Sequence, residues 1–371
     1  MSKKALQLAS VASMIDQFNI PNIKILQSLG YQVDVVADFT NPGTITKERA
    51  ENLKKRLSDM DVRVFDIAIP RFLNPGAISK AYSQVKELLN VENYDLLHCH
   101  SPIGGVIARQ AAKGLRKKGL KVIYTAHGFH FYDGAPFKNW LTYYPIEKHF
   151  SCYTDILITI NKEDYKRASE RFKAKKTVYV PGVGVDTDKF TPRQSGREKI
   201  RTELGLQDNQ IMLLSVGELN KNKNHEAVIK AITDMNLTYV IVGKGNLSEQ
   251  LKEVAEKQHV DLRLMGFRND VADFYNAADV YVLPSIREGL NVSLMEAMAS
   301  GLPIVCGRIR GNRDLIKDED CLFDPTAINE ISASIGYATE KRFDLGKRNL
   351  EAIQSVDRRQ IDSLMFGIYS H

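Results

Sequence analysis

The sequence predicts an α/β protein with two domains, each a parallel sheet covered by helices on both faces. Three observations support this prediction. The chain has 371 residues, enough for two ordinary domains with separate cores. Short apolar segments alternate with longer amphipathic ones along the chain, which is the pattern of repeated β–α units. A polar, turn-rich stretch at residues 186–198 interrupts this alternation near the middle and predicts a linker.

In the first half, the apolar segments are rich in Val, Ile and Leu, as expected for strands that are buried on both faces. We predict strands at residues 4–9, 32–37, 62–69, 94–99, 121–126, 155–160 and 177–180. Amphipathic segments with helical spacing lie between them. We predict helices at residues 20–29, 46–60, 77–89 and 103–118.

The second half restarts the same alternation after the linker. We predict strands at residues 211–216, 239–242, 262–265, 279–283 and 303–306, with helices beginning after residues 224, 247, 270 and 291. This half is similar in size to the first, so the two form a pair of related domains rather than one domain with an appendage.

Composition excludes several classes of protein. Hydrophobic residues make up 43% and charged residues 26% of the chain, as in globular proteins that are soluble. The chain contains no apolar run of the ~20 residues that a membrane span requires. The polar N-terminus does not resemble a signal peptide. The four cysteines have no metal-binding spacing and indicate no disulfide framework, so we expect a reducing cytoplasm.

Charge is distributed unevenly along the chain. Residues 1–186 carry 27 Lys and Arg against 18 Asp and Glu, whereas the remainder carries 24 against 27. Such an excess of positive charge in one half suggests an anionic partner for that half, either a membrane surface or a nucleic acid. No nucleic-acid recognition motif accompanies the charge, so we predict no nucleic-acid partner.

Two glutamates stand in one informative stretch, residues 279–303. A predicted buried strand runs into a loop with Glu288, and an amphipathic helix with Glu296 follows and ends at Gly301. The helix is expected to begin near Asn291. Its unpaired N–H groups and dipole would favour a phosphate at the edge of the sheet.

The residues around these two carboxylates resemble the donor-site signature of family 4 retaining glycosyltransferases. The shared features are Pro-Ser before the first Glu, Gly directly after it, and Glu-Ala-Met-Ala-x-Gly-x-Pro around the second. The resemblance implies that Glu288 contacts the transferred sugar and that Glu296 binds the ribose hydroxyls. It also implies that backbone N–H groups bind the diphosphate, namely those of Gly289, Leu290, Asn291 and Val292.

The resemblance further implies the GT-B fold, in which two Rossmann-like domains face a central cleft and the C-terminal helix crosses back. We expect residues 1–185 to bind the acceptor, residues 186–353 to bind the nucleotide sugar, and residues 354–371 to return to the first domain. A dehydrogenase would need a GxGxxG fingerprint after the first strand, where this sequence has Ser10-Val-Ala-Ser13.

The loop after the first strand of the second half supplies the expected phosphate contact. Lys223 occupies the family's phosphate-lysine position in the loop that begins at Gly217, where it would act as a point charge on a diphosphate. The family usually has Arg beside this glycine, but this sequence has Glu218. Either Lys223 and the helix N–H groups suffice, or one of Lys221, Lys244 and Arg308 substitutes. Gly243, Phe267 and Arg268 match other donor-cleft positions, the last two bordering the base mainly through their backbone.

His127 is the principal candidate in the first domain. It follows a predicted strand at the carboxyl end, where open α/β sheets bind ligands, and could bond a hydroxyl of the donor sugar or an oxygen of the diphosphate. Candidates on the acceptor side are Ser10, Ser13, His100 and His130. His98 and His100 have no third ligand at metal spacing, so we predict no metal and no other cofactor.

The resemblance therefore predicts a metal-independent, retaining hexosyltransferase with His127, Lys223 and Glu288 at the catalytic centre. It would use a nucleotide sugar, expected to be UDP-linked, and transfer a hexose or N-acetylhexosamine. The motifs His-Gly-Phe-His-Phe-Tyr at residues 127–132 and Tyr-Tyr-Pro at residues 143–145 resemble the exopolysaccharide and capsule branch. The acceptor would then be a lipid-linked saccharide on the cytoplasmic face of the membrane.

Two other functions share the expected fold. A sugar-nucleotide epimerase would form a new sugar nucleotide without an acceptor, and a non-catalytic protein would bind the donor without turnover. A peripheral membrane contact is also predicted. Residues 101–185 contain 15 Lys and Arg against 6 Asp and Glu, beside the aromatic segment 136–145 with the only tryptophan, Trp140. Basic residues attract anionic lipid, and Trp and Tyr suit the headgroup boundary.

Overall fold

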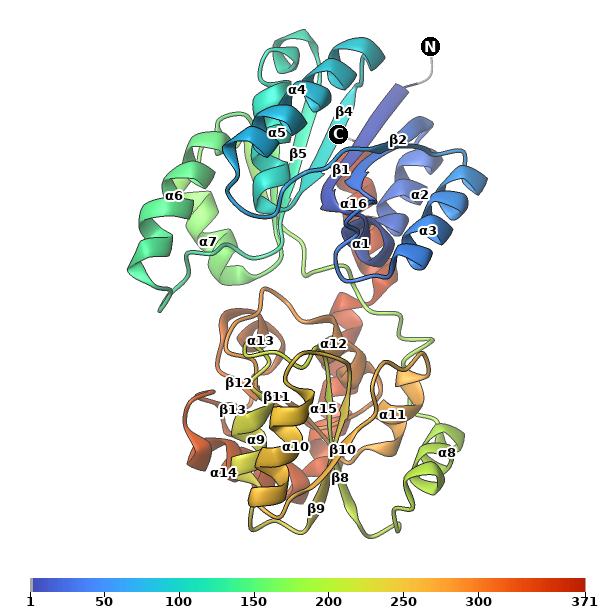
Figure 1. The fold of residues 1–371 in the computed structure, drawn as a ribbon, viewed down its shortest axis with the longest axis vertical. Coiled ribbons are helices and arrows are strands. Elements are labelled where there is room, and N and C mark those ends of the chain that lie inside the picture. Colours follow the sequence, from blue (N-terminus) through green and yellow to red (C-terminus); the bar gives the residue numbers. More distant parts are fainter. Residues whose placement is uncertain (1–2, 371) are drawn as a thin grey trace. The chain divides into compact units, whose positions relative to one another are not determined.

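The computed structural model describes residues 3–370, which fold into two units (Figure 1). Unit 1 comprises the chain up to Pro181 together with the segment from Ile361 onward, and unit 2 comprises Gly182–Gln360. Each unit is a parallel sheet with helices, so the predicted α/β class with two Rossmann-like domains is confirmed. The first unit ends slightly before residue 185, and residues 354–360 belong to unit 2.

The sheet of unit 1 has the order β3-β2-β1-β4-β5-β6-β7, and all its neighbouring strands are parallel. Its strands are β1 (Lys3–Val11), β2 (Tyr31–Asp38), β3 (Arg63–Asp66), β4 (Leu96–His100), β5 (Lys121–Ala126), β6 (Ile156–Thr159) and β7 (Lys176–Tyr179). Each coincides with a predicted strand, although β3 is shorter than the predicted segment 62–69.

Helices cover both faces of this sheet. They are α1 (Ala12–Met14), α2 (Ile20–Ser28), α3 (Lys47–Asp59), α4 (Pro75–Glu92), α5 (Pro102–Ala112), α6 (Phe137–Ser151) and α7 (Lys162–Arg171), with a π-helical turn at Ile15–Asn19. The predicted helix 103–118 is wrong at its end. It divides into α5 and a 3-10 turn, Leu115–Lys118, and Gly114 with its low helix propensity stands between them.

The two faces of the sheet hold separate apolar cores. Side chains alternate along a strand, so Ala5 of β1 packs with α2 and α3 while Leu6 packs with α4 and α5. The last helix, α16 (Arg358–Ser370), adds Ile361, Met365, Ile368 and Tyr369 to the first of these cores. This spacing places one apolar stripe of α16 on the sheet, and the prediction of a C-terminal helix returning to the first domain is confirmed.

Unit 2 repeats the arrangement with the order β10-β9-β8-β11-β12-β13. Its strands are β8 (Ile211–Val216), β9 (Leu237–Val242), β10 (Asp261–Leu264), β11 (Val280–Leu283), β12 (Ile304–Gly307) and β13 (Leu322–Phe323). Its helices are α8 (Gln194–Leu204), α9 (His225–Ala231), α10 (Ser248–Lys257), α11 (Val271–Ala277), α12 (Val292–Ala299), α13 (Arg310–Leu315), α14 (Ile328–Glu340) and α15 (Arg342–Ile353). The helices predicted after residues 224, 247, 270 and 291 are confirmed.

One part of the predicted linker is wrong. Residues 194–198 form the start of α8 rather than a turn-rich boundary. The segment is polar because α8 has a wide exposed face, and it buries few residues, among them Gly196 and Ile200. Polarity alone therefore did not separate a loop from the surface helix of this unit.

The order of the strands reverses at one point in each sheet. β1 lies between β2 and β4 in unit 1, and β8 lies between β9 and β11 in unit 2. Open α/β sheets bind ligands outside the carboxyl ends of the strands at such a switch point. The residues predicted to act on substrate lie at or after the carboxyl ends of β1, β4, β8 and β11 or of strands next to them, apart from Phe267 and Arg268, which follow β10.

Candidate active site

The loops that follow β8 and β9 approach each other closely at the carboxyl edge of the second sheet. A Cβ atom on Gly243 would lie 1.8 Å from the carbonyl oxygen of Gly217. The backbone N–H of Gly217 donates to Val242 O at 3.0 Å, and that of Gly243 donates to Gly266 O at 2.8 Å. Glycine at position 243 is therefore a packing requirement, because any side chain would push the two loops apart.

The loops after β8 and β11 are joined by hydrogen bonds and by an ion pair. The N–H of Ile286 donates to Asn222 O at 2.9 Å, and the Asn222 side chain donates to Arg287 O at 3.0 Å. Beside these bonds, Lys223 Nζ lies 2.7 Å from Glu288 Oε1, with both side chains 16% exposed. The structure thus brings together two residues predicted for the catalytic centre.

The start of α12 presents unpaired backbone donors. Asn291 caps this helix, since its Oδ1 accepts a hydrogen bond from Leu294 N at 3.2 Å. The predicted start near Asn291 is confirmed. Within the part of the chain that the structure describes, the backbone N–H groups of residues 289–292 make no hydrogen bond. Such a cluster of donors at a helix N-terminus suits an anionic oxygen.

Glu296 lies inside α12, as predicted, and its carboxyl group is largely buried. Tyr275 Oη donates a hydrogen bond to Glu296 Oε2 at 2.8 Å. Burial raises the pKa of Glu296 to about 7, while Tyr275 and the more distant Lys189 and Arg358 act in the opposite direction. This carboxyl group can accept hydrogen bonds from ligand hydroxyls and is about half ionised at neutral pH.

Phe267 and Arg268 follow β10 at the same edge of the sheet. The Arg268 guanidinium is held by two carboxylates, Glu203 at 2.8 Å and Asp270 at 2.8 Å, and the Phe267 side chain is 60% exposed. The Arg268 charge is thus committed to neighbours in the protein. A contact with a base through the backbone of these two residues stays a prediction.

Arg310 is a cation that the sequence did not single out. It begins α13, is 8% exposed, and its Nε donates to the carbonyl oxygen of Glu288 at 3.2 Å. Arg308, one of the proposed substitutes for the missing arginine, is engaged by Glu319 and by Leu322 O. The available signal was that Arg310 follows a strand of this sheet and precedes a glycine.

That glycine, Gly311, explains how Arg310 reaches the loop. A Cβ atom on Gly311 would lie 1.9 Å from the carbonyl oxygen of Gly289. The backbone of α13 therefore lies directly against the loop that carries Glu288, which places a buried arginine where the phosphate-binding donors are expected.

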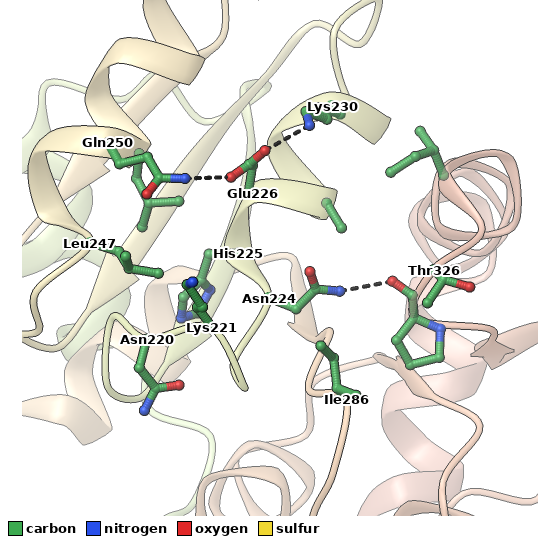
Figure 2. A pocket seen from close by; sticks show the side chains of 14 residues that line it. Asn220, Lys221, Asn224, His225, Glu226, Lys230, Leu247, Gln250, Ile286 and Thr326 are labelled. Carbon is green, nitrogen blue, oxygen red and sulfur yellow. Dashed lines mark hydrogen bonds and ion pairs between the residues drawn. The ribbon is translucent and has the colours of Figure 1, made fainter. Parts of the chain in front are cut away.

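A pocket of about 380 Å³ opens on the other flank of the β8 loop, and Figure 2 shows its side chains. Asn224 spans it by donating to Pro325 O at 2.8 Å, and its side chain also reaches Pro284 O at 3.3 Å. Glu226, which also lines the pocket, pairs with Lys230 at 2.6 Å. Asn224 therefore fixes the loop that carries Lys223 to the segments after β11 and β13.

In unit 1 the predicted histidine sits on a buried polar cluster. His127 Nε2 lies 3.1 Å from His100 Nδ1, and His100 Nε2 lies 3.2 Å from Gln7 Oε1. The His98 and His100 rings are 4.2 Å apart. His100 is only 1% exposed, so it lies beneath His127 and is not at the surface where the predicted acceptor contact would be made.

Burial keeps these rings neutral. It lowers the pKa of His98 to about 3 and that of His127 to about 4, and it holds the pKa of His100 well below its usual range. A neutral imidazole has one donor and one acceptor nitrogen. The cluster can therefore be hydrogen-bonded throughout without carrying charge.

The other acceptor-side candidates occupy different surroundings. His130 stacks on Tyr143, with the ring centroids 4.5 Å apart. Ser10 and Ser13 are 4% and 5% exposed. The Ser13 hydroxyl lies against the loop at Gly43, where an added Cβ would be 2.5 Å from it. A role for any of the three in acceptor binding stays a prediction.

Two further findings concern metals and membranes. Residues 3–370 contain no group of three His, Cys, Asp or Glu side chains placed to hold a metal ion. None of the helices formed by these residues has both the length and the apolar character needed to cross a bilayer.

Comparison with known proteins gives consistent matches over both units. Residues 196–354 match the family described as Glycosyl transferases group 1, and residues 23–189 match Glycosyltransferase Family 4. Putative glycosyltransferase EpsD of Bacillus subtilis (strain 168) is 37% identical over 327 residues, covering 86% of this chain and 82% of EpsD.

A second relative has a name that states its reaction. The UDP-Gal:alpha-D-GlcNAc-diphosphoundecaprenol alpha-1,3-galactosyltransferase of Escherichia coli is 29% identical over 326 residues, covering 84% of this chain and 81% of that protein. Among solved structures, Anabaena Alr3699/HepE in complex with UDP and glucose has a TM-score of 0.77 at 19% identity, with 99% of both chains covered. This likeness shows the GT-B fold.

Proposed function

This chain belongs to glycosyltransferase family 4, and from that premise we propose that it transfers a hexose or N-acetylhexosamine from a UDP-sugar to a lipid-linked saccharide with retention of configuration. The observation that carries the proposal is the Lys223–Glu288 pair beside the unpaired N–H groups of residues 289–292. A cation and backbone donors together suit a diphosphate, and the carboxylate suits the sugar attached to it.

The reaction follows from these contacts. When the bond between the sugar and the diphosphate breaks, negative charge grows on the leaving phosphate. Lys223 and the α12 N–H groups would stabilise this charge, and Arg310 would add a second cation. Glu288 would then hold the sugar and stabilise its developing positive charge. The acceptor hydroxyl would approach from the face that the phosphate leaves, and this phosphate would take the proton, so no separate protein base is required.

Glu296 would bind the ribose of the nucleotide. Its carboxyl group lies within α12, at hydrogen-bond distance from Tyr275, and can accept a bond from a ribose hydroxyl. Because this contact would be the same before and during the reaction, we assign it to donor affinity rather than to turnover.

The donor and acceptor are proposed from the chemistry that the relatives' names state. The Escherichia coli relative uses UDP-Gal and a diphosphoundecaprenol-linked acceptor, and HepE was solved with UDP. A lipid-linked acceptor of this kind agrees with the sequence motifs of the exopolysaccharide and capsule branch. We therefore place the reaction in exopolysaccharide or capsule synthesis, at the cytoplasmic face of the membrane.

Peripheral membrane contact is proposed through α6. This helix exposes Phe137 and Leu141 by 74% and 63%, with Lys138 beside them. The one carboxylate of the helix, Glu147, is buried against Arg109 at 2.9 Å. The exposed face thus combines apolar side chains with positive charge, as an anionic bilayer surface requires.

Trp140 does not belong to this exposed face. Its ring packs against Phe131, with the centroids 5.7 Å apart, and the Arg167 guanidinium lies 5.1 Å from its centroid. We therefore assign the proposed membrane contact to Phe137 and Leu141 rather than to Trp140.

The test is a transfer assay with the full chain. UDP-glucose, UDP-galactose, UDP-N-acetylglucosamine and UDP-N-acetylgalactosamine would be supplied with a saccharide linked to polyprenyl diphosphate, and GDP-mannose would be the control. We expect one UDP-sugar to be consumed with formation of an α-linked product, and the rate to be unchanged by EDTA. A new sugar nucleotide formed without acceptor would identify an epimerase instead. Binding of the donor without turnover would identify a non-catalytic protein.

A further inference from the structure

A continuous chain of hydrogen bonds connects the C-terminal helix with His127. Tyr369 Oη of α16 lies 2.7 Å from His98 Nδ1 and 3.3 Å from Gln7 Nε2. Gln7 Oε1 lies 3.2 Å from His100 Nε2, and His100 Nδ1 lies 3.1 Å from His127 Nε2. These hydrogen bonds connect side chains of β1, β4 and the segment after β5, which meet at the switch point of the first sheet.

The side-chain amide of Gln7 sets the direction of these bonds. Its nitrogen faces Tyr369, so it donates, and its oxygen faces His100, so it accepts. His100 therefore carries its proton on Nε2 and offers a lone pair on Nδ1. Because each neutral ring has one donor and one acceptor, His127 must donate from Nε2 to that lone pair.

The second branch of the network agrees with this direction. Tyr369 accepts from Gln7 and donates its own proton to His98 Nδ1, which leaves the proton of His98 on Nε2. That nitrogen lies 2.8 Å from Thr125 Oγ1, which accepts the bond. Turning the Gln7 amide over would reverse every bond together, since each donor would become an acceptor. The orientation of the Gln7 side-chain amide therefore determines which nitrogen of His127 carries the proton.

The hydrogen-bond network uses Nε2 of His127, so Nδ1 is available to a ligand. Within residues 3–370, Nδ1 of His127 has no hydrogen-bond partner, and the ring is partly exposed. In the observed direction this nitrogen carries a lone pair. A lone pair accepts a hydrogen bond from a hydroxyl and repels the oxygens of a phosphate.

We propose that Gln7, acting through His100, is a positioning residue that holds His127 in the tautomer protonated at Nε2, with Tyr369 fixing the Gln7 amide. In this tautomer His127 Nδ1 carries a lone pair, which suits a ligand hydroxyl and not the oxygens of a phosphate. The identity of the ligand rests on the proposed function, whereas the tautomer does not. This decides between the two roles that the sequence left open for His127.

The tautomer is tested by nuclear magnetic resonance on the full chain labelled with ¹⁵N-histidine. Two-bond ¹H–¹⁵N correlations distinguish the protonated nitrogen of each ring from the bare one. The native chain should show His127 protonated at Nε2 and bare at Nδ1, without any substrate. A native spectrum with the His127 proton on Nδ1 would overturn the proposal.

Variants show whether Gln7 controls that choice. Gln7→Leu removes both ends of the amide and should give a mixture of His127 tautomers. Tyr369→Phe should have a smaller effect, because Gln7 Nε2 can still reach His98 Nδ1 at 3.5 Å. Tyr94→Phe is the matched control, since it removes another buried hydroxyl of unit 1, bonded to Asp34 at 2.6 Å. If both network variants kept the native His127 spectrum, Gln7 would not be its positioning residue.

Activity measurements separate positioning from general damage. Gln7→Leu should lower kcat/KM for the donor about tenfold, the effect of one misplaced hydrogen bond in a site. In a His127→Ala background the same change should lower it less than twofold, because the partner through which Gln7 acts is gone. Equal losses in both backgrounds would contradict the proposal. The expected spectra in a chain without transferase activity would contradict the proposed function and leave the tautomer assignment intact.

Discussion

The two units have the same strand order but place different chemistry at the switch point. Unit 1 holds a cluster of neutral histidines with Gln7, and burial depresses the pKa of each ring. Unit 2 holds the charged pair Lys223 and Glu288 beside free backbone donors. In the proposed reaction, charge develops on the diphosphate and not on the sugar hydroxyls. The same strand order therefore supports a charged cluster at one switch point and a neutral, hydrogen-bonded cluster at the other.

The largest expected effect tests the charge in unit 2. Lys223→Ala should raise the barrier to transfer by about 3 kcal/mol, because a preorganised partner of the developing phosphate charge is lost. The measurement is kcat/KM with saturating acceptor, and Lys230→Ala, which removes a surface cation paired with Glu226, is the control. If Lys223→Ala kept activity within a few-fold of the native level, we would assign stabilisation of the phosphate charge to Arg310 instead.

The raised pKa of Glu296 predicts how the stability of unit 2 depends on pH. Its folded-state pKa of about 7 lies above the usual value of 4.5. Between pH 4.5 and 7 the folded chain therefore binds more protons than the unfolded chain, and the free energy of unfolding falls as pH rises through this range. Glu296→Gln removes this ionisation and should stabilise unit 2 by about 3 kcal/mol at pH 8. Urea unfolding followed by circular dichroism would measure this, with the exposed Glu256→Gln as control. Equal stability of Glu296→Gln and the native chain at pH 8 would contradict it.

The neutral half should respond to pH in the opposite sense. The folded-state pKa values of its histidines lie below the usual 6.5, so the unfolded chain binds more protons in acid and stability falls as pH drops below 6.5. Each such ring should cost about 2 kcal/mol between pH 6.5 and 5. Trp140, the only tryptophan, lies in unit 1, so its fluorescence during urea unfolding reports on this unit. Stability unchanged down to pH 5 would show that the rings are not buried as neutral groups.

The smallest effect concerns the outer surface of unit 1. The double substitution Phe137→Ser and Leu141→Ser should weaken binding to vesicles that contain anionic lipid by about 1 kcal/mol, because less apolar surface enters the headgroup region. Vesicle sedimentation at low and high salt measures the change. Phe343→Ser is the control, since this side chain is 79% exposed but belongs to unit 2. If Phe343→Ser weakened vesicle binding as much as the double substitution in α6, the exposed face of α6 would not be a specific membrane contact.

The sequence revealed much more of the donor half than of the histidine cluster. Glu288, Gly289 and Glu296 stand in one short stretch with a strand before it and a helix around the last, so their spacing was visible. The contact of Gln7 with Tyr369 joins residues 362 positions apart, and no local pattern indicates it. Polar residues on buried strands become interpretable only when the register brings their neighbours together.

Arg310 and α8 show two other limits of sequence reasoning. Arg310 was missed because a lone arginine after a strand is common, and its burial depends on the close approach of Gly311 to Gly289. Residues 194–198 were assigned to a linker because they are polar, yet they start a helix whose apolar contacts begin at Gly196. In both cases tertiary packing decided the outcome.

The proposed binding site of the donor diphosphate lies between Lys223 and the N-terminus of α12. Isothermal titration of UDP and of uridine tests it most directly, with the native chain, Lys223→Ala, and the double variant Lys223→Ala with Glu288→Gln, which leaves no unpaired carboxylate. We predict that both variants bind UDP at least about tenfold more weakly, as expected for loss of a charge-assisted contact, and that uridine affinity is unchanged. Native UDP affinity in the double variant would contradict the claim.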